Sequence, residues 1–315
     1  MVNLLTALAI AAGIVLILTP IFIPTLHKLK FGQSIRTEGP KSHQIKSGTP
    51  TMGGIFIVAG IVIATLFRSE ISVEVALALF ILIGHFILGF LDDYIKVVKK
   101  RNLGLKAKQK LAGQIIIAVV TIFIGIEELG INTTLWLPGG TEIDIGFLYY
   151  PLVLFVIVGA SNAVNLTDGL DGLASGCMAV AASCYMVICM LTGHQDLAIF
   201  CAAIIGACVG FLRFNFHPAK IFMGDTGSLA LGGAFAAVGI LTHTELLLAV
   251  VGFVFVCEAL SVILQVISFQ STGKRIFRMS PIHHHFELGG WSEIKVVFVF
   301  WTVGLIFGIT GLTIM

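Results

Sequence analysis

Ten apolar runs dominate this 315-residue sequence and limit what the chain can fold into. Each run has roughly 14 to 24 residues, and a helix of about 20 apolar residues crosses the ~30 Å hydrocarbon layer of a bilayer. The runs cover residues 3–26, 52–67, 75–91, 111–126, 147–164, 173–191, 197–212, 228–241, 246–269 and 296–314. The run 228–241 is the shortest and must use flanking residues to span. The pattern predicts an all-α polytopic membrane protein with about ten transmembrane helices.

Composition excludes an ordinary soluble domain. Hydrophobic residues make up 57% of the chain and charged residues 11%, whereas soluble domains have about 25% charged residues. The six cysteines lie in apolar stretches without a CxxC pair, so the sequence predicts neither a disulfide framework nor a zinc site. The run 3–26 is too long for the apolar region of a signal peptide and has no basic segment before it, so we expect a retained span. No repeat of fixed period divides the chain, and we expect one integral membrane domain, 1–315.

The basic residues predict the orientation. Of the 19 lysines and arginines, all but Arg68 fall in or beside the odd-numbered loops between the runs. Cytoplasmic loops carry an excess of basic residues, so the odd loops should be cytoplasmic and both termini should lie outside. We interpret the basic side chains of 99–101 as determinants of this topology. We expect no nucleic-acid partner for the protein. The longest even loop, 127–146, contains a Gly-rich turn at 138–140 that predicts a small hairpin outside the membrane.

Two adjacent carboxylates stand where the third run meets water. Asp92 and Asp93 follow an apolar stretch that begins at Val75, and ionisable groups at such a depth are candidates for function. On a helix, Lys96 lies four residues from Asp92 and three from Asp93, within reach of both. One cation does not balance two anions, so a divalent metal or a cationic ligand is expected there.

A second polar cluster occupies 162–172. Asn162, Asn165, Asp168 and Asp171 follow one another at three-residue intervals, so neighbours in this series lie close together on a helix surface. The glycines of the segment allow a turn and a close approach of a ligand to the backbone. A calcium-binding loop is excluded, because no glutamate follows at the required position and the oxygen-bearing residues do not alternate.

A third cluster, 215–228, precedes the eighth run. Gly224 and Gly227 allow backbone conformations that other residues avoid. The following helix would offer the N–H groups of its N-terminus, from Gly224 to Ser228, to a phosphate. Asp225 would then supply a metal ligand beside that phosphate. The segment lacks the Gly-Lys-Ser/Thr of a nucleotide-hydrolysing loop.

A fourth cluster contains His283, His284 and His285. Consecutive side chains of a helix diverge and metal-binding pairs favour i,i+4 spacing, so hydrogen bonding to a sugar or phosphate is favoured over zinc. The topology places all four clusters on the cytoplasmic side, which predicts a single active site at the inner membrane face. Glu258 and His85 lie inside apolar runs and are interpreted as polar core residues, with a functional role left open.

These clusters resemble the polyprenyl-phosphate N-acetylhexosamine-1-phosphate transferases. The motifs are LDDYIK at 91–96, NLTDGLDG at 165–172, FMGDTGS at 222–228 and PIHHHFE at 281–287. The last motif and KSGTPTMGG at 46–54 resemble those of the phospho-N-acetylmuramoyl-pentapeptide transferases, and the resemblance covers the whole chain. It implies transfer of phospho-N-acetylmuramoyl-pentapeptide from UDP to undecaprenyl phosphate, giving lipid I and UMP, with Mg²⁺, at the bacterial inner membrane. It also implies a homodimer.

The resemblance further implies roles for individual residues. Asp225 would hold Mg²⁺, Asp92 would act as base or nucleophile, and Asp93 would lie near the lipid phosphate and Lys96. The donor side would comprise Lys46, Thr51, Asn165, Asp168, Asp171, Asn215 and Gln265, with His284 and His285 at the sugar phosphate. Whether Asp92 forms a covalent intermediate stays open. A sister transferase that uses UDP-N-acetylglucosamine is the alternative enzyme. A cation transporter is the alternative of another class, although transporters bind near the membrane midplane.

Overall fold

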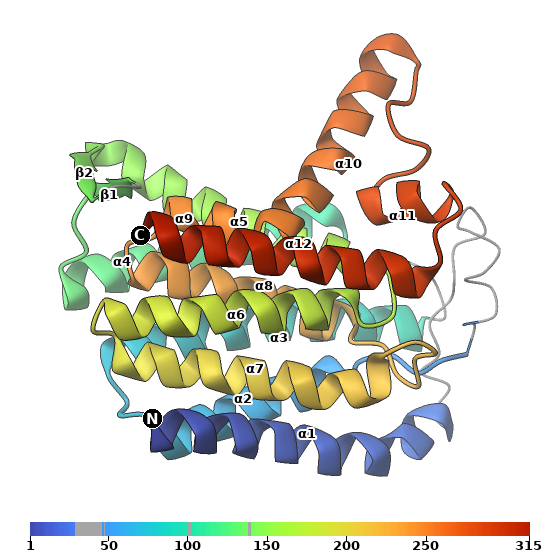
Figure 1. The fold of residues 1–315 in the computed structure, drawn as a ribbon, viewed down its shortest axis with the longest axis horizontal. Coiled ribbons are helices and arrows are strands. Elements are labelled where there is room, and N and C mark those ends of the chain that lie inside the picture. The colour runs from blue at the N-terminus through green and yellow to red at the C-terminus, as the bar shows by residue number, and fades with distance from the viewer. Residues whose placement is uncertain (29–45, 47, 100–102, 138–139) are drawn as a thin grey trace.

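The computed structural model of this protein describes residues 1–28, 46, 48–99, 103–137 and 140–315. Within these ranges, nine helices are long and apolar enough to cross a membrane, and one further apolar helix, Gly54–Arg68, is shorter. Figure 1 shows most of these helices lying side by side in one bundle. The predicted all-α polytopic class is therefore confirmed.

The helices follow the apolar runs closely. They are α1 (Val2–Lys28), α2 (Gly54–Arg68), α3 (Val73–Val98), α4 (Ala107–Leu129), α5 (Tyr149–Thr167), α6 (Leu173–Leu191), α7 (Gln195–Asn215), α8 (Gly224–Leu241), α9 (Glu245–Val251), α10 (Phe253–Thr272), α11 (Ile282–Glu287) and α12 (Glu293–Ile314), with a short 3-10 helix, η2 (Gly146–Leu148), before α5. Strands β1 (Thr134–Leu137) and β2 (Thr141–Asp144) pair antiparallel, with Leu137 opposite Thr141. The two predicted strands therefore pair as expected, and the side of the membrane on which they lie stays a prediction.

The two ends of the bundle differ. Both chain termini and the β1–β2 hairpin lie at one end, while α11 lies at the other (Figure 1). An even number of spans returns a chain to the side on which it began, so this arrangement agrees with ten spans.

Helix α8 forms the centre of the bundle. Every residue of this helix from Thr226 to Leu241 is buried. Its neighbours approach closely because small residues stand at the contacts. At Gly89 of α3, for example, an added Cβ would lie 2.1 Å from the backbone oxygen of Asp225, so only glycine lets the two helices touch there. This contact brings the carboxylates of α3 beside the first turn of α8.

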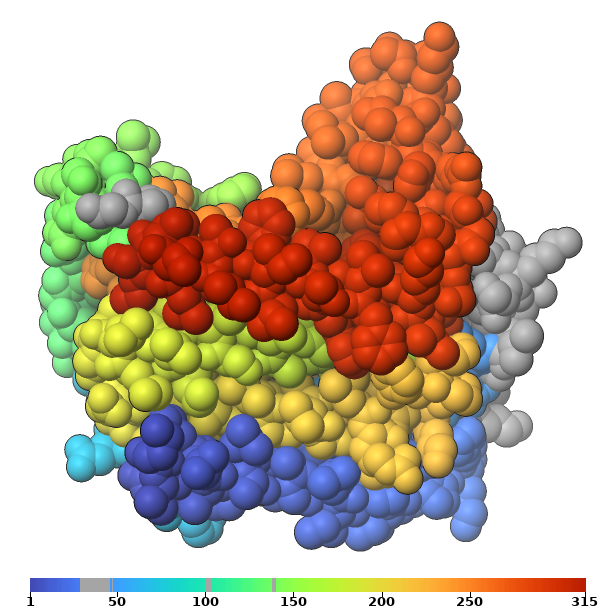
Figure 2. Space-filling model, viewed as in Figure 1, coloured from blue at the N-terminus to red at the C-terminus, as the bar shows by residue number. Residues whose placement is uncertain are grey.

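The ninth predicted span, 246–269, is wrong as a single helix. The structure divides it at Gly252, whose dihedral angles (φ −88°, ψ 22°) leave the helical region. The backbone there packs tightly, since a Cβ at this position would lie 2.7 Å from the ring of Phe235. Helix α10 turns away from the bundle, and Figure 2 shows it standing out from the body of the molecule. The break places the end of α10 and the loop after it above α11.

A buried carboxylate lies at the hairpin end of the bundle. Glu245, the first residue of α9, is 3% exposed, and the Tyr149 hydroxyl donates a hydrogen bond to its Oε1 at 2.5 Å. Burial raises the pKa of Glu245 to about 7, although the hydrogen bond from Tyr149 opposes this shift. Between pH 4.5 and about 7 the folded chain therefore binds a proton that the unfolded chain does not.

We expect the melting temperature of the detergent-solubilised protein to fall as the pH rises from about 5 to about 8. The stabilisation from protonated Glu245 is complete below the unfolded pKa and is lost as the pH rises through the folded one. The difference between the two pKa values corresponds to roughly 3 kcal/mol. Glu245→Gln cannot ionise and should flatten the slope in thermal unfolding followed by circular dichroism. An unchanged slope would assign the pH dependence to another group.

Candidate active site

Three carboxylates from two helices meet near the α11 end of the bundle. Asp92 and Asp93 lie in the last turns of α3, and Asp225 lies in the first turn of α8. One oxygen from each falls within 4.8 Å of the others. Asp92 is 2% exposed and Asp93 3%. Carboxylates packed this closely need positive charge among them.

Two lysines supply part of that charge. The Lys96 ammonium lies 2.6 Å from Asp92, 3.5 Å from Asp93 and 3.1 Å from Asp225. The predicted reach of Lys96 to both neighbouring aspartates is confirmed. The Lys110 ammonium, from the first turn of α4, lies 2.7 Å from Asp225 and 3.4 Å from Asp92. The sequence indicates only a basic loop residue at Lys110, because nothing in the local pattern connects it with Asp225, 115 positions away.

Asp93 accepts hydrogen bonds from the start of α8. Its Oδ2 accepts hydrogen bonds from the Thr226 backbone N–H at 2.9 Å and from the Thr226 hydroxyl at 2.7 Å. An added Cβ at Gly224 would lie 2.4 Å from the same Oδ2 and 2.7 Å from the Thr51 hydroxyl. Thr51 and Gly224 therefore border the carboxylates. We expected the N–H groups at the start of α8 to face a phosphate, but one of them, that of Thr226, donates its hydrogen bond to Asp93.

Asp92 contacts the segment that precedes α4. The Leu105 backbone N–H donates to its Oδ1 at 2.8 Å. An added Cβ at Gly104 would lie 2.5 Å from this carboxylate, so the segment before α4 packs directly on it. Asp92 thus has one oxygen engaged by the protein backbone and the other facing Lys96.

The 165–172 segment joins the same site. Asn165 Nδ2 donates to Asp225 Oδ1 at 2.9 Å and to the Ser228 hydroxyl at 2.8 Å. The Gly224 N–H bonds to Asp168, and burial together with the carboxylates of Asp225, Asp93 and Asp171 raises the pKa of Asp168 well above its usual range. The site therefore holds more carboxylates than the two ammonium groups balance, and a divalent cation would fit its donor set of oxygen atoms.

A second group of charged residues surrounds Asp171. Lys46 lies 2.7 Å from Asp171 and 2.5 Å from Glu293, and the Glu293 carboxylate also accepts the Asp171 backbone N–H at 2.7 Å. His217 Nδ1 lies 3.1 Å from Asp171 and 3.2 Å from Glu293. The contact between Lys46 and Asp171 joins two predicted donor-side residues. Glu293 and His217 were missed, because they come from segments that only the fold brings together.

Two predicted donor-side residues have their polar groups engaged by the protein itself. Asn215 accepts from the Gly172 N–H and the Ser175 hydroxyl, both at 3.1 Å, and donates to the Ile221 carbonyl at 3.0 Å. Gln265 accepts from the backbone N–H groups of 276 and 277 at 2.9 Å and donates to the carbonyl of Phe277 at 3.0 Å. Asn215 therefore links the backbone at Gly172 with the backbone at Ile221. Gln265 holds the loop between α10 and α11 in the same way.

The three histidines have different partners. His283 Nδ1 lies 3.0 Å from Glu258, His284 Nδ1 lies 2.8 Å from Glu287, and His285 Nδ1 accepts the Arg278 backbone N–H at 3.2 Å. Among the described residues, the groups that could hold a metal are Asp92, Asp93 and Asp225, and Asp171, His217 and Glu293. Neither group contains the consecutive histidines. His85 stays within the core, with Nδ1 2.9 Å from the Ile81 carbonyl.

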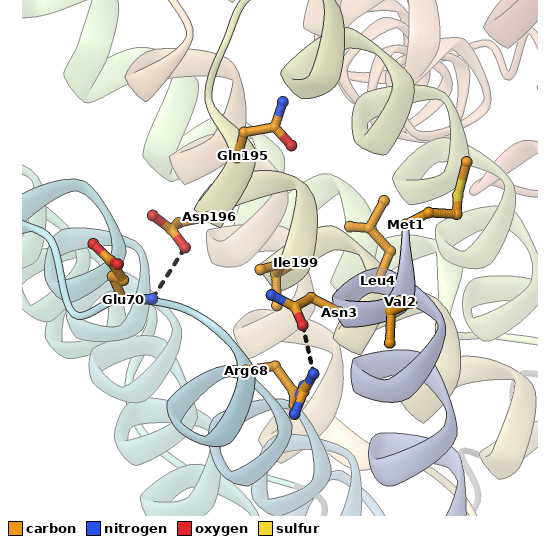
Figure 3. A pocket seen from close by; sticks show the side chains of 9 residues that line it. All are labelled: Met1, Val2, Asn3, Leu4, Arg68, Glu70, Gln195, Asp196 and Ile199. Atoms are coloured by element: carbon orange, nitrogen blue, oxygen red, sulfur yellow. Dashed lines mark hydrogen bonds between the residues drawn. The ribbon is translucent and has the colours of Figure 1, made fainter.

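A cavity of about 560 Å³ lies far from these residues, at the end of the bundle that carries the N-terminus. Figure 3 shows the residues that line it, among them Asn3, Arg68 and Asp196. Arg68 donates to Asn3, and Asp196 accepts the Glu70 backbone N–H at 3.0 Å. None of the predicted site residues lines this cavity.

Comparison with known proteins agrees with the motifs. The model of glycosyl transferase family 4 matches residues 75–243, and the signature of the phospho-N-acetylmuramoyl-pentapeptide transferases matches residues 46–58. Similar relatives include the phospho-N-acetylmuramoyl-pentapeptide-transferases of Geobacillus sp. (strain WCH70), 58% identical over 98% of this chain and 96% of the relative, and of Bacillus subtilis (strain 168), 58% identical over 95% and 93%. The corresponding protein of Halalkalibacterium halodurans is 56% identical over 98% and 96%.

The fold, the site and the family 4 match together define a membrane-embedded transferase. Within that class, the identity across nearly the whole length decides the family. The chain belongs to the phospho-N-acetylmuramoyl-pentapeptide transferases.

Proposed function

We propose that this protein transfers phospho-N-acetylmuramoyl-pentapeptide from its UDP carrier to undecaprenyl phosphate. An oxygen of the lipid phosphate forms a bond to the phosphorus that carries the sugar, and the bond from that phosphorus to UMP breaks. The products are lipid I and UMP. One pyrophosphate replaces another, so the equilibrium should favour neither side strongly.

The observation that carries this proposal is the cluster of Asp92, Asp93 and Asp225 with two lysines at one end of the bundle. Phosphoryl transfer between phosphates requires alignment and charge neutralisation more than covalent chemistry by the protein. The Lys96 and Lys110 ammonium groups lie 2.6 to 3.5 Å from these carboxylates, and both would contact phosphate oxygens when a substrate binds beside them.

The residues present fit a magnesium ion. Asp225 would hold it, with Asp92 and Asp93 beside it, because hard divalent cations prefer carboxylate oxygens. Bound Mg²⁺ would neutralise the charge of the pyrophosphate. The chain's own residues then have separate tasks. Asn165 orients Asp225 through the 2.9 Å hydrogen bond. Asp92 either acts as a base that assists the attacking lipid phosphate or, as a nucleophile, displaces UMP from the sugar-bearing phosphorus and is then displaced by the lipid phosphate.

The donor would extend from the carboxylates toward Asp171. Thr51 borders the carboxylates, and Lys46 lies beside Asp171. Lys46 would exchange its contact with Asp171 for a contact with the donor. Asp171 is 2% exposed and would offer its carboxylate to the nucleoside, beside the backbone that Asn215 holds at Gly172. His284 and His285 would contact the sugar phosphate.

The test of the proposed function is a substrate comparison. Purified protein in vesicles that contain undecaprenyl phosphate is supplied with radiolabelled UDP-N-acetylmuramoyl-pentapeptide or UDP-N-acetylglucosamine. Incorporation of label into lipid from the first donor alone is expected. Preference for the second donor would identify the sister transferase, and ion flux without lipid labelling would identify a transporter.

We further propose that the α11 end of the bundle faces the cytoplasm of a bacterial inner membrane. The sugar nucleotide donor is soluble and the acceptor is a lipid, so a site at the inner face reaches both. In this orientation both termini and the hairpin lie outside. The single membrane domain 1–315 and the homodimer implied by the family resemblance are predictions of the same kind.

The orientation predicts which side each loop faces. Lys99 follows α3 at the site end, and Glu128 lies near the end of α4 toward the hairpin. In a variant without native cysteines, a cysteine at 128 should react with an impermeant maleimide in intact spheroplasts, whereas a cysteine at 99 should react only after permeabilisation. The opposite labelling would place the site on the wrong side for a cytoplasmic donor.

A further inference from the structure

Helix α10 carries a buried carboxylate that the proposed reaction does not use. Glu258 is 0% exposed, although much of the surrounding helix surface is apolar and exposed. Ser261 and Gln265 are buried on the same face of this helix, since residues three and seven positions apart share a face. A charged group at such a position is costly unless a partner compensates it.

The partner of Glu258 is the first histidine of α11. His283 is also 0% exposed, and its Nδ1 lies 3.0 Å from Glu258 Oε2. A carboxylate accepts hydrogen bonds, so Nδ1 should carry the proton that points to it. The contact then places a proton on Nδ1 and fixes one orientation of the ring, as carboxylates do for histidines that bind metals.

The opposite edge of the His283 ring touches the site. An added Cβ at Gly169 would lie 2.3 Å from His283 Nε2 and 2.7 Å from Cε1. Gly169 stands beside Asp168 in the 165–172 segment, so glycine is required here to admit the imidazole. Within the described part of the chain, His283 Nε2 has no hydrogen-bond partner. The ring of His284 follows, with its centroid 4.1 Å from that of His283.

We infer that Glu258 is a positioning residue for the transfer reaction. It acts through His283, whose ring lies between α10 and the 165–172 segment and whose Nε2 edge faces Gly169 of that segment. Gln265 holds the loop that leads to α11, and Glu258 holds α11 itself. This inference rests on the proposed function only through the activity measurement; the contact between the two side chains is tested separately.

The decisive variants are Glu258→Gln and Glu258→Leu. The glutamine carbonyl can still accept from His283 Nδ1, whereas leucine fills the space without an acceptor. We expect Glu258→Leu to lower kcat for lipid I formation roughly 10- to 100-fold, the usual loss for the partner of a functional histidine, with little change in the KM for undecaprenyl phosphate. Glu258→Gln should retain kcat within roughly threefold.

Glu245→Leu is the matched control. Glu245 is a second buried carboxylate with a single side-chain donor, at the opposite end of the bundle. A merely structural role for Glu258 predicts that both leucine variants lower the melting temperature while kcat at low temperature stays normal. That result would overturn the inference.

In the cycle with His283→Ala, the double variant Glu258→Leu, His283→Ala should be no less active than His283→Ala alone, because Glu258 acts through this ring. Multiplying losses would contradict the inference.

Nitrogen NMR of ¹⁵N-labelled histidine provides a readout besides activity. The His283 signals, assigned by their loss in His283→Ala, should show a protonated Nδ1 in the wild type and in Glu258→Gln, and should change in Glu258→Leu. A bare Nδ1 in the wild type would refute the proposed contact. If the wild type transferred no sugar from either donor, the proposed function would fail, and these spectra would still decide the contact.

Discussion

Asp225→Asn is expected to reduce lipid I formation at least roughly a thousandfold, the scale on which enzymes lose rate when a central electrostatic group is removed. The amide keeps the shape of the side chain but loses the charge that holds a hard cation. It also loses the charge that faces Lys96 and Lys110 at 3.1 and 2.7 Å. The measurement is the initial rate of lipid labelling over a series of Mg²⁺ concentrations.

Asp196→Asn is the matched control for this variant. Asp196 stands in the first turn of α7 as Asp225 stands in the first turn of α8, but it borders the cavity at the other end of the bundle. The control should keep wild-type activity, and both variants should elute as folded protein. Near-normal turnover of Asp225→Asn at low Mg²⁺ would show that Asp225 is not the metal ligand.

Lys110→Gln is expected to lower kcat roughly a hundredfold. Its ammonium lies 3.4 Å from Asp92 and 2.7 Å from Asp225, so in the proposed reaction it would stabilise the charge that develops as the donor pyrophosphate breaks. Glutamine keeps a similar length and a hydrogen-bond donor but removes the positive charge. Steady-state rates with saturating donor and lipid acceptor measure the effect.

Lys108→Gln separates this role from the general effect of basic charge on α4. Lys108 lies two residues earlier on the same helix and is exposed. Its replacement should leave kcat unchanged and preserve the orientation in the membrane. Equal rates for the two glutamine variants would leave Lys110 as one more basic residue of a loop, without a role in transfer.

The apolar runs predicted the spans because burial in lipid depends on the composition of each segment and not on its neighbours. The hairpin was predictable for a similar local reason, since the Gly-rich turn stands between the two short strands. The contacts of Lys96 with Asp92 and Asp93 follow from helical spacing alone. The motifs were sufficient to indicate the family, because the chemistry depends on particular side chains in short segments.

The break at Gly252 was not predictable from composition. The residues on both sides are apolar, so the run 246–269 looks like one span. Close packing of Gly252 against Phe235 and the buried pair of Glu258 with His283 involve residues distant in sequence. These contacts accompany the departure of α10 from the bundle.

The sequence by itself thus determined the membrane class, the approximate spans and the identity of the motifs, because hydrophobicity and short-range spacing are local properties. Only the tertiary structure decided which side chains share a site. Lys110 reaches Asp225 across 115 positions, and Lys46 reaches Glu293 across 247. It also decided that Asn215 and Gln265 use their hydrogen bonds on the backbone of neighbouring loops. Such contacts depend on how helices pack, which no local pattern encodes.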